Sequence, residues 1–139
     1  MRSVAFLVPG PPVAKGRARL TTINGQARQF TPARTVAYES KVAHAGAQAM
    51  AQEPLFTGPV AIEIEARFQI AKSWTRKKRL AAMEGTFRHT SRPDADNLLK
   101  AIGDGLNGVV YIDDSQIVEA RLSKRWSDGP GVSVVVREL

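Results

Sequence analysis

Acidic side chains are concentrated in one short stretch of this basic chain, whose formal net charge is +7. Five aspartates lie there: Asp94, Asp96, Asp104, Asp113 and Asp114. Neighbouring carboxylates repel one another unless a cation neutralises them. Carboxylate oxygens are also the ligands that hard cations such as Mg²⁺ and Mn²⁺ prefer. The pattern therefore predicts a metal site built from the Asp94–Asp96 pair and the Asp113–Asp114 pair.

Helical spacing groups part of this stretch on one surface. Asp96, Lys100 and Asp104 follow one another at intervals of four residues, which places them along one face of a helix. Pro93 restricts the preceding backbone and leaves Asp94 at the helix entrance. If residues 109–112 run back along this helix as extended chain, the Asp113–Asp114 pair returns to the same entrance.

Each acidic residue also has a structural interpretation. Asp94 is suited to cap a helix, and Asp96 is suited to interact with the helix dipole in the first turn. An Asp96–Lys100 pair is an ordinary surface ion pair of small energetic value. Aspartates 113 and 114 are also common turn residues. The stretch is not an EF-hand, because the glycine and the terminal glutamate of that loop are missing.

The excess of basic residues indicates a polyanionic partner. Lysine and arginine number 20 against 13 aspartates and glutamates. Two segments carry candidate phosphate contacts: Lys15, Arg17 and Arg19 in one, and Arg76, Lys77, Lys78 and Arg79 in the other. The alternative for each segment is a solvated charged surface.

The order of expected elements predicts how these residues are positioned. We expect, in order, a strand over 3–8, a hairpin turning at Asn24–Gly25, helix 33–52, strand 60–70, helix 75–83, helix 94–106, an extended piece 109–112, and strands 117–126 and 131–139. Thr31 is expected to cap the first helix and Pro32 to be its first residue. The turn at 127–130 predicts that the last two strands pair antiparallel. Residues 1–139 thus form one α+β domain with a mixed, mainly antiparallel sheet packed with helices.

Composition excludes several other classes of protein. The chain has no cysteine, which removes disulfides and thiolate chemistry and fits a cytoplasmic location. It has no apolar run of about 18 residues, so no membrane-spanning helix is expected. Trp74 and Trp126 are expected in the core. His44 in its helix and His89, alone in a basic loop, are not expected to be catalytic.

The motifs resemble those of a known family. The segments Arg92-Pro93-Asp94-x-Asp96-Asn97-Leu98-x-Lys100, Asp104-x-Leu106-Asn107 and Asp113-Asp114-x-Gln116-Ile117 are similar to the signature of RusA-type Holliday junction resolvases. The opening Pro9-Gly10-Pro11-Pro12 and Lys15-Gly16-Arg17-Ala18-Arg19 are similar to that family's N-terminal segment. The resemblance implies a homodimeric α+β enzyme, often of phage or prophage origin, that cuts two opposed strands of a four-way DNA junction.

The same resemblance implies roles for individual residues. Asp94, Asp96 and Asp114 would bind the metal, and Lys100 would be the catalytic lysine. Asp113 and Asp104 would be supporting residues. The resulting hypothesis is Mg²⁺-dependent phosphodiester hydrolysis in DNA recombination and repair, with Mn²⁺ as an alternative ion. Two other functions remain open: a non-catalytic DNA-binding module, and a small metal-dependent phosphatase acting on nucleotides.

Overall fold

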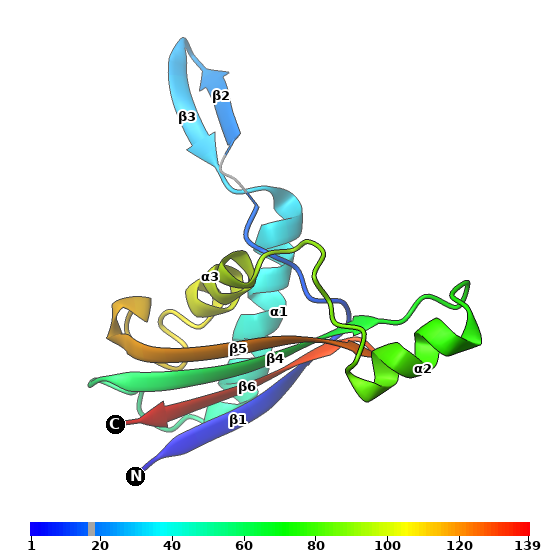
Figure 1. Ribbon diagram of the computed structural model, residues 1–139. Helices are drawn as coiled ribbons and strands as arrows, with labels where there is room; N and C mark the ends of the chain where they lie inside the picture. The colour runs from blue at the N-terminus through cyan, green and yellow to red at the C-terminus, as the bar shows by residue number, and fades with distance from the viewer. Residues whose placement is uncertain (17–18) are drawn as a thin grey trace.

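The computed structural model describes residues 1–16 and 19–139, and it describes Arg19 by its backbone alone. Its elements, in chain order, are β1 (Ser3–Pro9), β2 (Arg19–Ile23), β3 (Gln26–Phe30), α1 (Ala33–Met50), β4 (Val60–Gln69), α2 (Arg76–Glu84), α3 (Ala95–Gly105), the 3₁₀ helix η1 (Asp114–Gln116), β5 (Ile117–Ser127) and β6 (Gly131–Glu138). Figure 1 shows one sheet with α1 and α3 beside it and a hairpin, β2–β3, that projects away from it. The expected order of helices and strands is confirmed.

The main sheet is mixed and mainly antiparallel, as expected. Its strand order is β1-β6-β4-β5. Strand β6 pairs antiparallel with both β1 and β4, whereas β4 pairs parallel with β5. The β2–β3 hairpin forms a separate two-stranded sheet. At its turn Asn24 and Gly25 both have positive φ, 52° and 76°, as a tight hairpin turn requires.

The expected pairing of the last two strands is wrong. Strands β5 and β6 run in opposite directions, but β4 lies between them. Strand β6 carries the fully buried Val132 and Val136, so it gains most from neighbours on both sides. Strand β5 carries exposed charged residues such as Glu119 and Arg125, which suit a sheet edge.

The core forms between one face of this sheet and helices α1 and α3. Alternate residues of β4, Val60, Ile62 and Ile64, join a single buried cluster with Val42 of α1 and Ile102 of α3. Each such side chain contributes about 1.5–3 kcal/mol when it leaves water. This burial fixes α3, and with it the aspartates at its start, against the sheet.

The helix termini differ in detail from those expected. Pro32 is the N-cap residue of α1 and no side chain caps that helix, so Thr31 does not have the predicted role. Thr75 does cap α2, because its Oγ1 accepts a hydrogen bond from the Lys78 amide at 3.2 Å. Helix α1 ends at Met50, since the following residue adopts a left-handed conformation. Among the described residues no helix is long and apolar enough to cross a membrane.

The segment after α3 is a compact turn and not the expected extended piece. The Val110 amide donates to the Leu106 carbonyl at 3.1 Å, and the Gly108 amide donates to the Tyr111 carbonyl at 2.7 Å. Tyr111 is fully buried, and its hydroxyl donates to the Gly103 carbonyl at 2.7 Å. The chain therefore returns to the C-terminal half of α3 and not to its entrance.

An aromatic cluster lies outside the main core. Trp126 contacts Trp74 and His89 with ring centroids 4.8 Å and 4.4 Å away, and Phe87 is part of the same cluster. His89 also stacks on Phe68 at 4.0 Å. His89 lies in a loop, as expected, but it is not isolated, because it is only 6% exposed and packs in this cluster. The two tryptophans pack, as expected, but in this separate cluster and not in the main core.

Candidate active site

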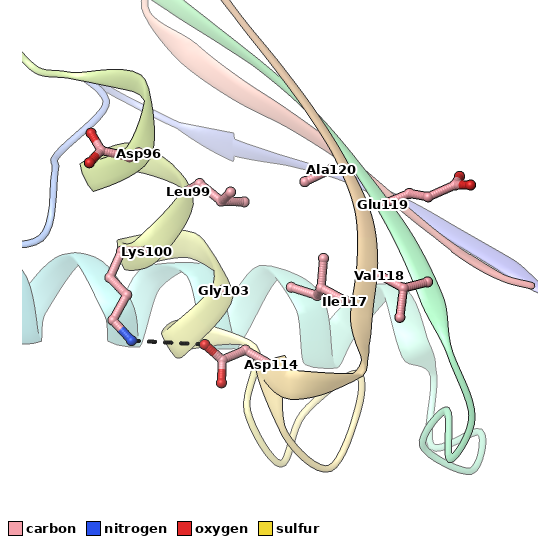
Figure 2. A pocket seen from close by; sticks show the side chains of 9 residues that line it. All are labelled: Asp96, Leu99, Lys100, Gly103, Asp114, Ile117, Val118, Glu119 and Ala120. Carbon is pink, nitrogen blue, oxygen red and sulfur yellow. Dashed lines mark ion pairs between the residues drawn. The ribbon is translucent and has the colours of Figure 1, made fainter.

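Lys100 and Asp114 face each other across a pocket between α3 and the start of β5 (Figure 2). Lys100 Nζ lies 3.9 Å from Asp114 Oδ2 and 3.3 Å from Asp104 Oδ1. The pocket has a volume of about 340 Å³. Its lining consists of Asp96, Leu99, Lys100, Gly103, Asp114, Ile117, Val118, Glu119 and Ala120. Three of the predicted site residues, Asp96, Lys100 and Asp114, therefore share one pocket.

The hydrogen bonds of η1 fix the position of Asp114. Asp113 Oδ2 accepts from the Ser115 amide at 3.0 Å, and Gln116 Oε1 accepts from the Asp113 amide at 3.0 Å, which closes a capping box. Gln116 Nε2 also donates to the carbonyls of Phe56 and Gly58, both at 2.9 Å. These bonds tie the turn to the segment before β4 and present Asp114 to α3.

Asp113 does not line this pocket and serves the turn. The hydrogen bond from Ser115, with a smaller contribution from Lys100, lowers the pKa of the Asp113 carboxyl below its ordinary value. One of its oxygens is thus already occupied as a cap. Its supporting metal role remains a prediction, and the structure gives it a second role in forming η1.

The two aspartates at the start of α3 lie apart from Asp114. Asp94 is the N-cap residue of α3, but its side chain makes no capping hydrogen bond, so the simple capping interpretation is not supported. It lines a separate pocket of about 500 Å³ together with Arg92 and Asn97. Asp96 Oδ1 accepts from the Asn97 amide at 3.0 Å. Figure 2 shows the Asp96 carboxylate directed away from Asp114.

The three predicted metal ligands do not converge. Among the described residues no three histidine, aspartate or glutamate side chains form a group that could hold a metal ion. At 1.5 Å per helical residue, Asp94 lies about 14 Å along the axis from Gly103, beside which Asp114 packs. Asp96 and Asp114 nevertheless line one pocket. Since Mg²⁺ is commonly held by one or two carboxylates with water and substrate phosphate, this donor set suits such an ion.

Asp104 lies between two lysines. Its Oδ2 is 3.3 Å from Lys15 Nζ, and its Oδ1 is 3.3 Å from Lys100 Nζ. Lys15 Nζ is also 2.5 Å from Glu39 Oε1, and this hydrogen bond raises the pKa of Lys15 above its ordinary value of 10.5. The Lys15 amide donates to the Asn97 carbonyl at 2.9 Å. Lys15 therefore ties the N-terminal loop to α1 and α3, and its predicted DNA contact would compete with two carboxylates.

The other predicted phosphate contacts lie elsewhere. Lys78 Nζ lies 4.1 Å above the Trp74 ring. Lys78 shares α2 with Arg76, Lys77 and Arg79, and Figure 1 shows α2 at the opposite end of β5 from η1. The 11 residues of β5 span roughly 35 Å, so α2 would meet DNA far from Asp114. Arg17 lies outside the described residues, and the contact predicted for the Arg19 side chain stays a prediction.

Sequence reasoning missed Lys124. This β5 residue donates hydrogen bonds from Nζ to the carbonyls of Ser91 and Pro93, at 2.8 Å and 3.0 Å. The sequence signal for its burial was its spacing of two residues from Leu122 and from Trp126. Residues two apart on a strand point to the same face, and here that is the face of β5 that packs against the helices.

Comparison with known proteins identifies the family. The family model described as "Endodeoxyribonuclease RusA" matches residues 9–137. The chain belongs to the RusA endodeoxyribonuclease family. A Bacillus subtilis (strain 168) protein named "Uncharacterized protein YqaN" is 37% identical over 141 residues, covering 100% of this chain and 99% of that protein. The resemblance inferred from the motifs is confirmed, and membership of this family supports nuclease activity.

Proposed function

We propose that this RusA-family protein is a divalent-metal-dependent endodeoxyribonuclease that cuts two opposed strands of a four-way DNA junction. The observation that carries the proposal is the pocket in which Lys100 faces Asp114 and which Asp96 also lines. A lysine beside carboxylates, open to solvent in a basic protein, is suited to phosphodiester hydrolysis. We place this activity in the cytoplasm, in DNA recombination and repair.

Asp96 and Asp114 would hold the ion, with Asp94 as the third ligand that the motif predicts. When bound, Mg²⁺ or Mn²⁺ supplies a Lewis acid and lowers the pKa of a bound water. Asp94 is available for this role because its side chain makes no capping bond. The rigid η1 turn keeps Asp114 in place, so the arrival of substrate need not reorder that ligand.

Lys100 has the mobility that its proposed role requires. Its side chain is 57% exposed, and its contact with Asp114 is long at 3.9 Å. Its contact with Asp104 is closer, at 3.3 Å. Ion pairs of an exposed lysine contribute at most about 1 kcal/mol each, so the ammonium can turn from them toward a phosphate. Lys100 would then stabilise the negative charge that develops on the scissile phosphate.

A homodimer suits the proposed substrate. Two active sites related by a two-fold axis can address two symmetric strands of one junction. The charge of +7 per chain would attract the junction, and each phosphate contact would make binding more sensitive to salt. Analytical ultracentrifugation of the free protein and of its junction complex tests the stoichiometry.

The decisive test replaces one carboxylate oxygen. Asp96→Asn keeps the side-chain shape and removes the charge, so we expect a loss of about 100-fold or more in Mg²⁺-dependent cleavage of a synthetic junction. Binding of the same junction without metal should be retained. Asp128→Asn is the matched control, since Asp128 is exposed in the turn between β5 and β6. Full cleavage by Asp96→Asn would refute the role of Asp96.

A non-catalytic DNA-binding module is the second candidate. The observation that favours it is the pairing of Lys100 with two carboxylates, in a described structure where no three acidic side chains converge. This candidate predicts salt-dependent junction binding by the wild-type protein with no nicking at any concentration of Mg²⁺ or Mn²⁺. The cleavage assay above separates the two functions directly.

A further inference from the structure

We infer that Lys124 is a positioning residue that holds the loop before α3 and thereby places Asp94 for its role in the active site. The inference rests on the proposed function, because it assigns Lys124 to the metal site of that function. The observation is the pair of hydrogen bonds from Lys124 Nζ to the Ser91 and Pro93 carbonyls, at 2.8 Å and 3.0 Å. Ser91 and Pro93 flank Arg92, and Pro93 directly precedes Asp94.

The loop has few other ties at this point. Residues 85–93 form no helix or strand. Nearer α2, the amides of Gly85, Thr86 and Phe87 bond back to that helix. Within residues 90–93, the carbonyls of Ser91 and Pro93 are the backbone groups for which the structure describes a hydrogen bond, and Lys124 donates both. The described backbone hydrogen bonds of residues 90–93 therefore both come from this one ammonium group. The first turn of α3 has a separate tie, since the Lys15 amide donates to the Asn97 carbonyl at 2.9 Å.

The chemistry of lysine suits this task. An ammonium group has three donors in a compact head, so it can serve two carbonyls at once, and bonds from a charged donor are stronger than neutral ones. Lys124 extends from β5, which is hydrogen-bonded to β4 along most of its length. The loop is thus anchored to the sheet. The same strand begins directly after η1, the short helix that starts at Asp114.

This arrangement links the two separated halves of the site. Asp114 stands just before β5 and Asp94 stands just after the loop that β5 holds. The positions of both carboxylates therefore depend on β5, although the turn after α3 keeps them apart in the free protein. Residues that orient metal ligands without touching the metal commonly change affinity or activity by about 10- to 100-fold when they are replaced.

The variant that tests this is Lys124→Met, which keeps the apolar stem and removes every donor. We expect kcat/KM for junction cleavage to fall about 10- to 100-fold, with a matching rise in the Mg²⁺ concentration needed for half-maximal activity. Junction affinity without metal should change less than threefold. Lys124→Arg retains donors for both carbonyls and should recover most of the lost activity.

Two measurements do not depend on catalysis. Amide hydrogen exchange should accelerate in residues 90–98 of Lys124→Met, because the entry to α3 loses its anchor. The rise in Tm on adding Mn²⁺ should shrink in the same variant. Arg121→Met is the matched control, since Arg121 is exposed on the opposite face of β5 and carries the same charge. We expect it to leave junction cleavage, hydrogen exchange and the Mn²⁺-dependent rise in Tm unchanged.

The outcomes separate this inference from the proposed function. Wild-type activity, metal response and hydrogen exchange in Lys124→Met would overturn the positioning role while leaving the nuclease intact. A fall in activity that Arg121→Met reproduces, or that Lys124→Arg does not reverse, would also overturn it. A wild-type protein that binds junctions but never cuts them would refute the proposed function, and hydrogen exchange and the Mn²⁺-dependent Tm would still decide whether Lys124 orders the approach to Asp94.

Discussion

Two glycines of α3 lie two residues apart, and we predict that replacing them with alanine changes stability in opposite directions. A Cβ on Gly103 would meet Tyr111 Oη at 3.7 Å and Asp114 Cβ at 3.8 Å, which is ordinary van der Waals contact. A Cβ on Gly105 would meet the Glu39 carbonyl oxygen and Val42 Cβ, both at 3.1 Å. The second position therefore lies directly against the backbone of α1.

The magnitudes follow from helix propensity and packing. Gly103→Ala should raise the free energy of unfolding by about 1 kcal/mol, the usual difference between glycine and alanine inside a helix. Gly105 is the last residue of α3, so the propensity gain there is smaller. The tight contact with α1 should cost about 1–3 kcal/mol, because the Glu39 carbonyl belongs to the backbone and cannot rotate away. Gly105→Ala should therefore destabilise the protein.

Urea unfolding of both variants provides the test. We expect the midpoint to rise for Gly103→Ala and to fall for Gly105→Ala with an unchanged m-value. Gly129→Ala is the control, since Gly129 has nothing within 4 Å of the added Cβ and should change stability by less than about 0.5 kcal/mol. If both α3 variants were equally stabilised, the close approach of α1 to α3 would be refuted.

Three further predictions concern charge and metal. Burial, assisted by the charge of Lys124, lowers the pKa of His89 in the folded protein. As pH falls, the unfolded state therefore takes up a proton first, and the free energy of unfolding should decline below about pH 6.5. His89→Phe should remove this decline in urea titrations from pH 7 to 4.5. Because the pKa of Lys15 is raised in the folded protein, its stabilising effect is present below pH 10.5 and disappears at higher pH. Lys15→Met should lower the free energy of unfolding by about 1–3 kcal/mol at pH 7, measured by urea unfolding. The difference from wild type should narrow at alkaline pH. EDTA should abolish junction cleavage but leave gel-shift binding intact, and restoration of cutting by Ca²⁺ as efficiently as by Mg²⁺ would contradict a site specific for small octahedral ions.

Local sequence patterns predicted those features that depend on neighbouring residues. The alternation of Val60, Ile62 and Ile64 predicted β4, because a strand with one buried face has a period of two. Asn24–Gly25 predicted the hairpin, since both positions require positive φ. The motif around Asp94 predicted both α3 and the family. In each case, the physical cause lies within a few residues of its effect.

Long-range competition decided the features that sequence reasoning got wrong. The turn between β5 and β6 indicated only that the two strands are connected. Which strand each one pairs with depends on which of them would expose more apolar surface at the edge of the sheet. The valines of β6 gain more from a central position than the charged side chains of β5 do. The burial of His89 was missed for a similar reason, because its partners Phe68 and Trp126 lie on distant strands.

The predicted return of Asp114 to the helix entrance failed because residues 106–111 form a hydrogen-bonded turn. The bond from Tyr111 to the Gly103 carbonyl holds the turn against the C-terminal half of α3, and nothing in the local pattern around Asp113 and Asp114 indicates it. Asp114 therefore meets Lys100 in the free protein, whereas Asp94 remains at the other end of the helix.

Lysine side chains neutralise part of this acidic stretch in the free protein. Lys15 and Lys100 flank Asp104, and Lys100 also reaches Asp114, so lysines supply the positive charge that clustered acids require. An ion held by Asp114 would compete with the 3.9 Å contact from Lys100, whose 3.3 Å contact with Asp104 would remain. The Lys100 ammonium would then be available to a negatively charged phosphate at the same pocket. On this reasoning ion binding and phosphate binding should reinforce each other, and Lys100→Met should weaken their coupling more than it weakens either binding event alone.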